Sequence, residues 1–164
     1  MTRLPLITPE QPGDAAEVDA LIEAAFGPGR LAKAAERLRE GNTPVEGLSV
    51  VARENGRIVG CARMWPVRVG ERAAILLGPF AVAATWRSRG LGAALVKAAC
   101  ERTRDAGHGL VILVGDAPFF CKLGFQQVAA KSLSLPGPVD MRRVMTMALV
   151  PGASDGLTGQ VTAG

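Results

Sequence analysis

A glycine-rich turn at residues 86–92 constrains the fold most, because it joins an apolar run to a helical pattern. The run before it, residues 73–82, has the composition of a buried strand. After it, Leu91, Leu95 and Ala98 recur at helical spacing. A helix that starts directly after a tight turn points its unpaired N–H groups and its positive end at that turn. The sequence therefore predicts an α/β arrangement with an anion site at this junction.

The residues of the turn itself favour a phosphate ligand. Gly90 and Gly92 leave the backbone free of side chains, so that a ligand can approach it closely. Arg87 and Arg89 add formal positive charge beside the exposed N–H groups. These features together indicate a doubly charged anion, and a pyrophosphate suits them best.

Spacing separates the phosphate motifs that such a turn could represent. A P-loop has four residues between its glycines and then Lys-Ser/Thr, whereas Leu91 alone separates Gly90 from Gly92. A dinucleotide fingerprint needs a small residue where Leu95 stands. The remaining pattern, Arg87-x-x-Gly90-x-Gly92, resembles the acetyl-CoA motif of the GNAT N-acetyltransferase superfamily. That family also tends to place a Val five residues before the Arg, the position of Val82.

A second block strengthens this resemblance. Residues 115–125, which follow an apolar strand pattern at 110–114, resemble the GNAT segment in which a short helix ends at Leu-Gly-Phe. In that segment Gly124 would supply the left-handed stop. Residues 135–140 resemble a branch of uncharacterised predicted GNAT acetyltransferases. The resemblance covers roughly residues 3–150 and is strongest from 75 to 125.

The resemblance implies the GNAT fold, an α/β (α+β) domain with a mixed central sheet of about six to seven strands. Helices would cover both faces, and one strand pair would be splayed. We expect one acetyltransferase domain at 1–150 and a flexible tail at 151–164, where Gly, Ser, Thr and Ala dominate. Residue patterns predict strands at 3–8, 49–53, 57–66, 73–82, 110–114, 126–135 and 143–149, and residues 67–69 either extend the third strand or lie outside it. They predict helices from Asp14 to Ala25, from Arg30 to Glu40 and from Leu91 to Arg104.

Gly78-Pro79 interrupts the apolar run and has two interpretations. The strand either begins at Phe80, or it contains a bulge that parts it from the strand at 110–114. We favour the bulge, which leaves backbone groups of Phe80 and Val82 unpaired. By resemblance, the pantetheine arm of acetyl-CoA lies in such a gap. The Phe80 N–H would then stabilise the oxyanion of the tetrahedral intermediate.

The resemblance also assigns the residues that contact acetyl-CoA. Lys122 would meet the ribose phosphate of CoA or would simply face solvent. The full set of contacts expected for acetyl-CoA is Phe80, Ala81, Val82, Arg87, Ser88, Arg89, Gly90, Leu91, Gly92, Ala93, Phe120 and Lys122.

The acid–base groups are harder to assign. Many GNAT members have a Tyr five residues before the Phe of Leu-Gly-Phe as general acid, but Phe120 stands there and the chain has no Tyr. Cys121 is either a substitute acid or a packing residue. Asp116 is either a general base or a helix N-cap.

Composition excludes several other classes of protein. The net charge of +4 suits an anionic ligand, but no Lys/Arg run exceeds Arg142-Arg143, so nucleic acid is not favoured. The three cysteines lack CxxC spacing, which argues against disulfides and metal. No run reaches membrane length, so we expect a cytoplasmic protein without a membrane partner.

The function predicted is transfer of an acetyl group from acetyl-CoA to a primary amine, directly in a ternary complex. One alternative is a non-catalytic CoA-binding or sensor domain of the same fold. A second is a nucleic-acid-associated factor, for which only the pI of 9.4 argues. The sequence decides neither the acceptor nor whether the protein is a homodimer. By resemblance, residues 26–30, 41–48 and 135–140 shape the acceptor site, and their low charge disfavours a highly charged acceptor.

Overall fold

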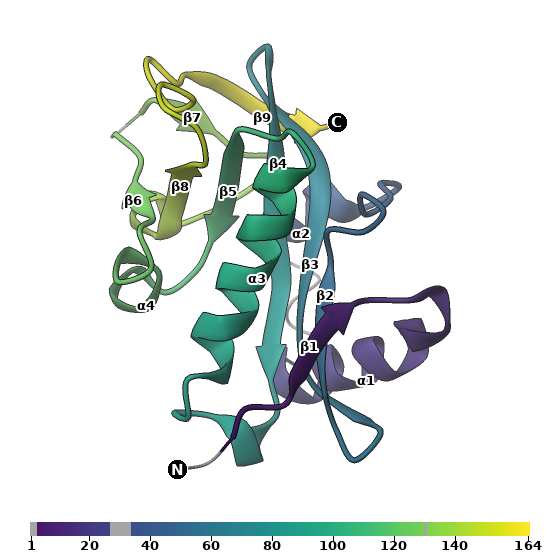
Figure 1. Cartoon of the computed structure of the whole chain (residues 1–164). Coiled ribbons are helices and arrows are strands. Elements are labelled where there is room, and N and C mark those ends of the chain that lie inside the picture. The colour runs from purple at the N-terminus through teal and green to yellow at the C-terminus, as the bar shows by residue number, and fades with distance from the viewer. Residues whose placement is uncertain (1–2, 27–33, 130) are drawn as a thin grey trace.

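The protein is an open, mixed β-sheet covered by helices on both faces, as a computed structural model shows for residues 3–26, 34–129 and 131–164 (Figure 1). Its nine strands within these residues exceed the six to seven expected, but the predicted fold class is confirmed. The strands are β1 Leu6–Pro9, β2 Val50–Glu54, β3 Arg57–Val69, β4 Arg72–Val82, β5 Leu110–Val114, β6 Gln126–Gln127, β7 Leu133–Ser134, β8 Val144–Ala148 and β9 Gly159–Ala163. The helices are α1 Ala15–Phe26, α2 Ala34–Arg39, α3 Leu91–Asp105 and α4 Ala117–Cys121, with 3₁₀ turns η1 Pro12–Asp14, η3 Ala84–Trp86 and η4 Met141–Arg143.

The strand order places the two blocks of the sequence side by side. The order is β1-β2-β3-β4-β5-β8-β6, and β4 with β5 is the parallel pair of this path. The helix α3 makes the crossover between them, as parallel neighbours require. The C-terminal ends of β4 and β5 therefore lie at the same end of the sheet.

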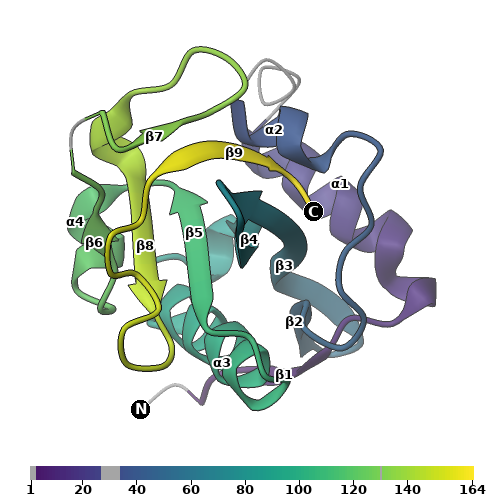
Figure 2. The same ribbon diagram turned by 90° about the horizontal axis from the view of Figure 1, so that it is seen from above.

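Alternation along the strands explains how both faces are buried. Val50 and Ala52 pack into the cluster that contains the apolar side of α3. Val51, between them, packs instead against Val18 and Ile22 of α1. Successive side chains of a strand point to opposite faces, so one strand serves two cores. Figure 2 shows α3 on one side of the sheet and α1 with α2 on the other.

A glycine sets the close approach of α3 to the sheet. A Cβ at Gly60 would lie 2.6 Å from Cδ1 of Leu95 and 3.4 Å from Cδ2 of Leu91. Any larger residue would push the first turns of α3 outward. Gly60 thus fixes where the start of α3, and the turn before it, meet the end of β4.

The strands β4 and β5 part early, as the bulge interpretation predicts. They pair only at Ile75 with Val111 and at Leu76 with Ile112. Beyond that point Leu77 pairs with Met64 and Phe80 with Ala62, so Gly78 and Pro79 lie opposite the single residue Arg63 and form a bulge in β4. Because β4 starts at Arg72, the alternative that the strand begins at Phe80 is wrong. The indole Nε1 of Trp65 donates to the carbonyl of Gly78 at 2.5 Å and holds the bulge.

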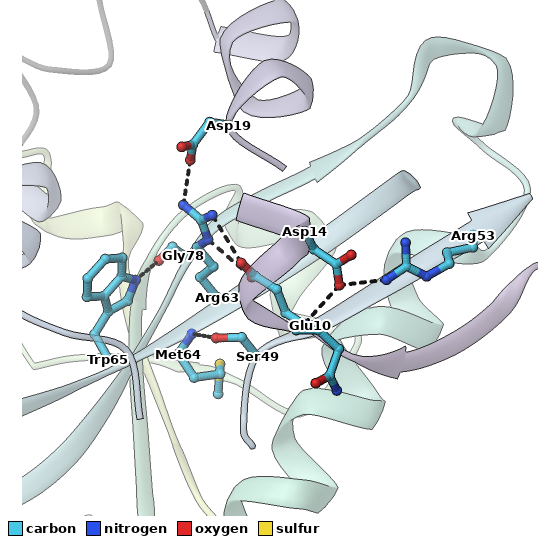
Figure 3. A network of polar contacts seen from close by, with 10 residues as sticks. Glu10, Asp14, Asp19, Ser49, Arg53, Arg63, Met64, Trp65 and Gly78 are labelled. Carbon is cyan, nitrogen blue, oxygen red and sulfur yellow. Dashed lines mark hydrogen bonds and ion pairs between the residues drawn. The ribbon is translucent and has the colours of Figure 1, made fainter. Parts of the chain in front are cut away.

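Ion pairs fasten α1 and the segment before it to the sheet (Figure 3). Arg63 of β3 contacts Glu10 at 3.1 Å and Asp19 at 2.8 Å. Asp14 contacts Arg53 of β2 at 2.6 Å and accepts a hydrogen bond from the Gln11 N–H. The hydrogen bond from Arg53 is the main cause that lowers the pKa of Asp14. The helix begins directly after Asp14, where the sequence predicts it.

Two predictions about the last third of the chain are wrong. The continuous strand expected at 126–135 is reduced to β6 and β7, two residues each. The segment expected to be a flexible tail contains β9, which pairs with β3 and with β7. Val161 of β9 is 1% exposed, because it packs in the apolar cluster that contains Val67 and Val69 of β3. The predicted helix at 30–40 is observed as α2, and residues 30–33 lie outside the described residues.

Candidate active site

The predicted phosphate turn is an open backbone cradle at the start of α3. Gly90 is the N-cap of α3 with φ 85°, and Ser88 also has a positive φ of 62°. Left-handed residues in such a turn curl the backbone into a concave surface with its N–H groups inward. The first N–H groups of α3 have no partner within the helix. A Cβ on Gly90 would have no atom within 4 Å, so the surface is open.

Two arginines flank this cradle, and each is anchored. Arg87 donates from Nε to the carbonyl of Val82 at 3.3 Å. The guanidinium of Arg89 lies 5.1 Å above the ring of buried Trp86, a cation–π arrangement. Both side chains are exposed, so their charges face solvent beside the cradle.

The cradle is the rim of a cavity of about 330 Å³ that runs along the end of β4. Most of the lining belongs to one continuous stretch of chain, from β4 into α3. The lining residues are Ala25, Phe26, Phe80, Ala81, Val82, Trp86, Arg87, Ser88, Gly90, Gly92, Ala93 and Phe119. We call this the donor cavity.

The backbone of β4 turns toward the gap at this cavity. The Ala83 N–H donates to the Val59 carbonyl of β3 at 2.8 Å. Because antiparallel strands alternate in the direction of their hydrogen bonds, Val82 and Phe80 direct their backbone groups away from β3. The contact of Arg87 with the Val82 carbonyl agrees with this direction. On that side β5 has already diverged.

Four phenylalanine rings pack together between the donor cavity and the hydrophobic core. The Phe80 ring stacks on Phe119 with centroids 5.8 Å apart, and Phe120 packs edge-on against both. Phe125 continues the cluster at 5.7 Å from Phe120. A Cβ on Gly92 would lie 3.0 Å from Cζ of Phe80, so this glycine admits the ring.

A second cavity of about 440 Å³ adjoins the first and shares Phe26 and Phe80 with it. It lies where β4 and β5 part, between α2 and the segment before β8. It is lined by Phe26, Ala34, Ala35, Arg39, Leu77, Gly78, Pro79, Phe80, Leu113, Val114, Gly115, Phe120, Pro138, Val139, Asp140 and Arg143. We call this the acceptor cavity.

The charged groups of the acceptor cavity differ in their pairing. Arg39 pairs with Glu36 at 2.7 Å. Asp140 accepts from both the backbone and the side chain of Arg142, and the side-chain hydrogen bond is the main cause that lowers the pKa of Asp140. Arg143 donates from Nε to the carbonyl of Gly115 at 3.2 Å.

The predicted catalytic side chains are distributed unevenly around these cavities. Phe120 is 5% exposed and lines the acceptor cavity, with its ring where a Cβ on Gly115 would be only 2.5 Å away. Asp116 caps α4 by accepting from the Phe119 N–H, as the capping interpretation predicts, and it lines neither cavity. Cys121 and Lys122 are exposed and also line neither cavity.

The other two cysteines are buried, and their thiols are unreactive. Burial raises the pKa of the Cys61 and Cys100 thiols to about 12. Neither supplies a thiolate near neutral pH. Within residues 3–26, 34–129 and 131–164, no group of three or more His, Cys, Asp or Glu side chains could hold a metal ion. No helix of the described structure is long and apolar enough to cross a membrane.

Sequence reasoning missed Arg39 and Arg143 of the acceptor cavity. Both lie in ordinary amphipathic or turn sequence, and only the fold brings them to one place. The segments expected to shape this site are partly present, through Phe26 and residues 138–140. No residue of 41–48 lines the cavity, and residues 27–30 lie outside the described residues.

Comparison with known proteins agrees with this geometry. Residues 46–127 match the family model described as an acetyltransferase (GNAT) domain. An Escherichia coli K12 protein, the uncharacterized N-acetyltransferase YhbS, is 30% identical over 158 residues, which are 95% of this chain and 94% of that one. The chain belongs to the GNAT acetyltransferase family. The predicted family, fold and enzyme class are thereby confirmed.

Solved GNAT structures superpose closely on this member of the family. A crystal structure of YhbS from Escherichia coli in complex with CoA has a TM-score of 0.83 and 28% identity, and the match covers 100% of this chain and 92% of that one. A GNAT acetyltransferase from Brucella melitensis in complex with acetyl-CoA has a TM-score of 0.73 and 27% identity, over 97% and 95% of the two chains.

Proposed function

We propose that the protein transfers an acetyl group from acetyl-CoA to a primary amine, directly in a ternary complex. The observation that carries this proposal is the donor cavity, which runs along the end of β4 to the cradle at Gly90. The solved relatives from Escherichia coli and Brucella melitensis, which hold CoA and acetyl-CoA, support the same donor here.

The cradle suits the pyrophosphate of CoA. The N–H groups of residues 88–93 and the positive end of α3 would bind its oxygens, and Arg87 and Arg89 would add charge. The pantetheine arm would extend along Phe80, Ala81 and Val82, where the backbone groups of Phe80 and Val82 face away from β3 and can receive it like an added strand. Exposed Lys122 has no cavity-lining position that supports a contact with CoA.

The reaction then takes place where the two cavities meet, at Phe80. The amine nitrogen attacks the thioester carbonyl carbon, the carbon–sulfur bond breaks, and the CoA thiolate leaves. The N–H of Phe80 would donate to the carbonyl oxygen and stabilise its negative charge in the intermediate. Stabilisation by a fixed backbone donor needs no side-chain acid.

Proton transfers would proceed through water. Asp140, the one carboxylate that the described structure places in the lining of the acceptor cavity, is held in its ionised form by Arg142 and is therefore a weak base. Neither Cys121 nor Asp116 lines either cavity. We infer that the amine loses its proton to water and that water protonates the leaving thiolate.

Two measurements test this function. Acetyl-CoA should raise the melting temperature by mass action, while NADH and ATP should not. Release of CoA thiol in the presence of a panel of primary amines should exceed the release without them. Stabilisation without amine-dependent release would favour the alternative, a CoA-binding or sensor domain, for which the Phe at position 120 argues. A flat melting temperature at millimolar acetyl-CoA would overturn both.

A further inference from the structure

We propose that the acceptor is a free apolar α-amino acid whose carboxylate binds to Arg143 while its side chain fills the acceptor cavity. This inference rests on the proposed acetyl transfer and names its substrate class. It is based on three features of the acceptor cavity: one cation without an ion-pair partner among the described residues, the place of that cation in a lining that Phe80 shares, and the apolar character of the rest.

Charge pairing singles out Arg143. Of the charged groups that line the acceptor cavity in the described structure, Arg39 is paired with Glu36 and Asp140 with Arg142. The terminal nitrogens of Arg143 make no hydrogen bond or ion pair there, and only its Nε is engaged. The charge of Arg143 makes a smaller contribution to the lowered pKa of Asp140 than the hydrogen bonds of Arg142 do. The cavity therefore presents one guanidinium whose ion-pairing positions are available.

The side chain of Arg143 is exposed, but two hydrogen bonds fix the position of the residue. Its Nε donates to the Gly115 carbonyl at 3.2 Å, and its own carbonyl accepts from the Gly115 N–H at 2.9 Å. These two contacts tie the residue to the turn between β5 and α4. A guanidinium fixed through Nε offers its two terminal nitrogens as a fork that matches a carboxylate.

The other residues that line the acceptor cavity indicate which kind of chemical group the ligand carries beside its carboxylate. Apart from the charged residues, the lining consists of aliphatic and aromatic side chains, glycine and proline. Leu77 and Pro79 come from β4, Leu113 from β5, and Val139 from the segment before β8. A second charge on the ligand would lose its hydration here without a partner. An aliphatic or aromatic side chain would instead bury its surface favourably.

This arrangement also orients the amine. Phe80 lies at the boundary of both cavities, so the acetyl carbon is expected at one end of the acceptor cavity and Arg143 at its wall. In an α-amino acid the amine and the carboxylate are attached to one carbon. Fixing the carboxylate therefore limits the amine to a small volume, which favours attack. A simple alkylamine lacks this second anchor.

Titration calorimetry on the CoA-loaded protein tests the inference separately from turnover. Leucine, methionine and phenylalanine are compared with 3-methylbutylamine, which is leucine without its carboxylate. We expect the best of these amino acids to bind about 10- to 100-fold more tightly than the amine, the range of a hydrogen-bonded ion pair. Arg143→Gln should remove that advantage and leave amine binding unchanged. Arg143→Lys should retain part of it, and Arg57→Gln, an exposed arginine outside both cavities, should retain all of it.

The outcomes distinguish this inference from the proposed function. Equal binding of amino acids and amine, no measurable amino acid binding, or an Arg143→Gln variant that keeps the preference would each overturn the inference. In all of these cases CoA binding and acetylation of other amines can persist, and then the proposed function stands. The CoA-loaded protein is prepared by first titrating CoA into the free protein. If CoA does not bind in that titration, the proposed function is rejected together with the inference.

Discussion

The donor and acceptor cavities meet at Phe80, but they are built in different ways. The donor cavity is lined mainly by residues of one stretch of chain, 80–93, and its proposed anion site consists of backbone. The acceptor cavity is lined by side chains from four separate parts of the chain: the end of α1 with α2, the bulge of β4, the end of β5 with α4, and residues 138–143.

The difference explains why the donor side of the site could be predicted from the sequence, whereas the acceptor side can change from one protein to another. A backbone cradle depends on a few glycines and a helix start, so most substitutions outside it leave it intact. A cavity made of distant side chains changes with every residue that lines it. Acyltransferases of this fold can thus keep one donor while the acceptor varies, and variants on the two sides should separate donor affinity from acceptor affinity.

The largest effect is expected at the cradle, for Gly90→Glu. The new carboxylate would occupy the open surface and repel phosphate, at a cost of several kcal/mol. We expect CoA affinity to fall at least about 100-fold in calorimetry. Gly107→Glu is the matched control, because Gly107 also has a positive φ, 95°, and open space around it, but lines neither cavity. An equal loss in both variants would attribute the effect to backbone strain.

Arg87→Ala should weaken CoA by about 10- to 100-fold, the effect of removing a charged hydrogen-bond donor. The loss should shrink at high salt, because the charge is exposed. Acceptor affinity should not change. Arg57→Ala serves as the control for lost surface charge. Unchanged CoA affinity in Arg87→Ala would place the pyrophosphate elsewhere and would break the contrast between the cavities.

A smaller effect, on acceptor binding and not on CoA binding, is expected for Arg37→Ala. Arg37 of α2 donates to the Pro136 carbonyl at 3.2 Å, and its guanidinium lies against Gly137, so it steadies the segment that forms one wall. We expect the KM for the acceptor to rise about 2- to 10-fold, with the Kd for CoA unchanged. Arg68→Ala removes a similar bond, to Glu71 in a distant turn, and should change neither constant. A rise in the Kd for CoA would contradict separate construction of the two cavities.

The smallest effect is expected for Cys121→Ala. Because this thiol is exposed and lines neither cavity, kcat and CoA affinity should equal those of the wild type at every pH. A general acid would instead lower kcat by about 100-fold or more when removed. A pH-dependent loss of kcat in Cys121→Ala would return the cysteine to the mechanism and would reject proton transfer through water.

Most of the fold and the donor side of the candidate site could be predicted from the sequence. The hairpin at Asn55-Gly56, the helix after Gly90 and the bulge at Gly78-Pro79 were all predictable, because turn chemistry and hydrophobic period act over a few residues. The strand at 126–135 was not, since its pattern is apolar at several positions and only the packed structure shows that the chain bends away after Gln127.

The sequence by itself determined the family and the position of the backbone cradle for which we propose an anion, because both depend on residues that are neighbours along the chain. Only the tertiary structure decided that Arg143 lines an apolar cavity without an ion-pair partner among the described residues, that Cys121 does not line this cavity, and that residues 159–163 join the sheet. The physical reason is that local geometry follows from the φ and ψ preferences of adjacent residues. Pairing, exposure and cavity shape instead depend on segments more than a hundred residues apart, such as α2 and β9, and no local pattern records them.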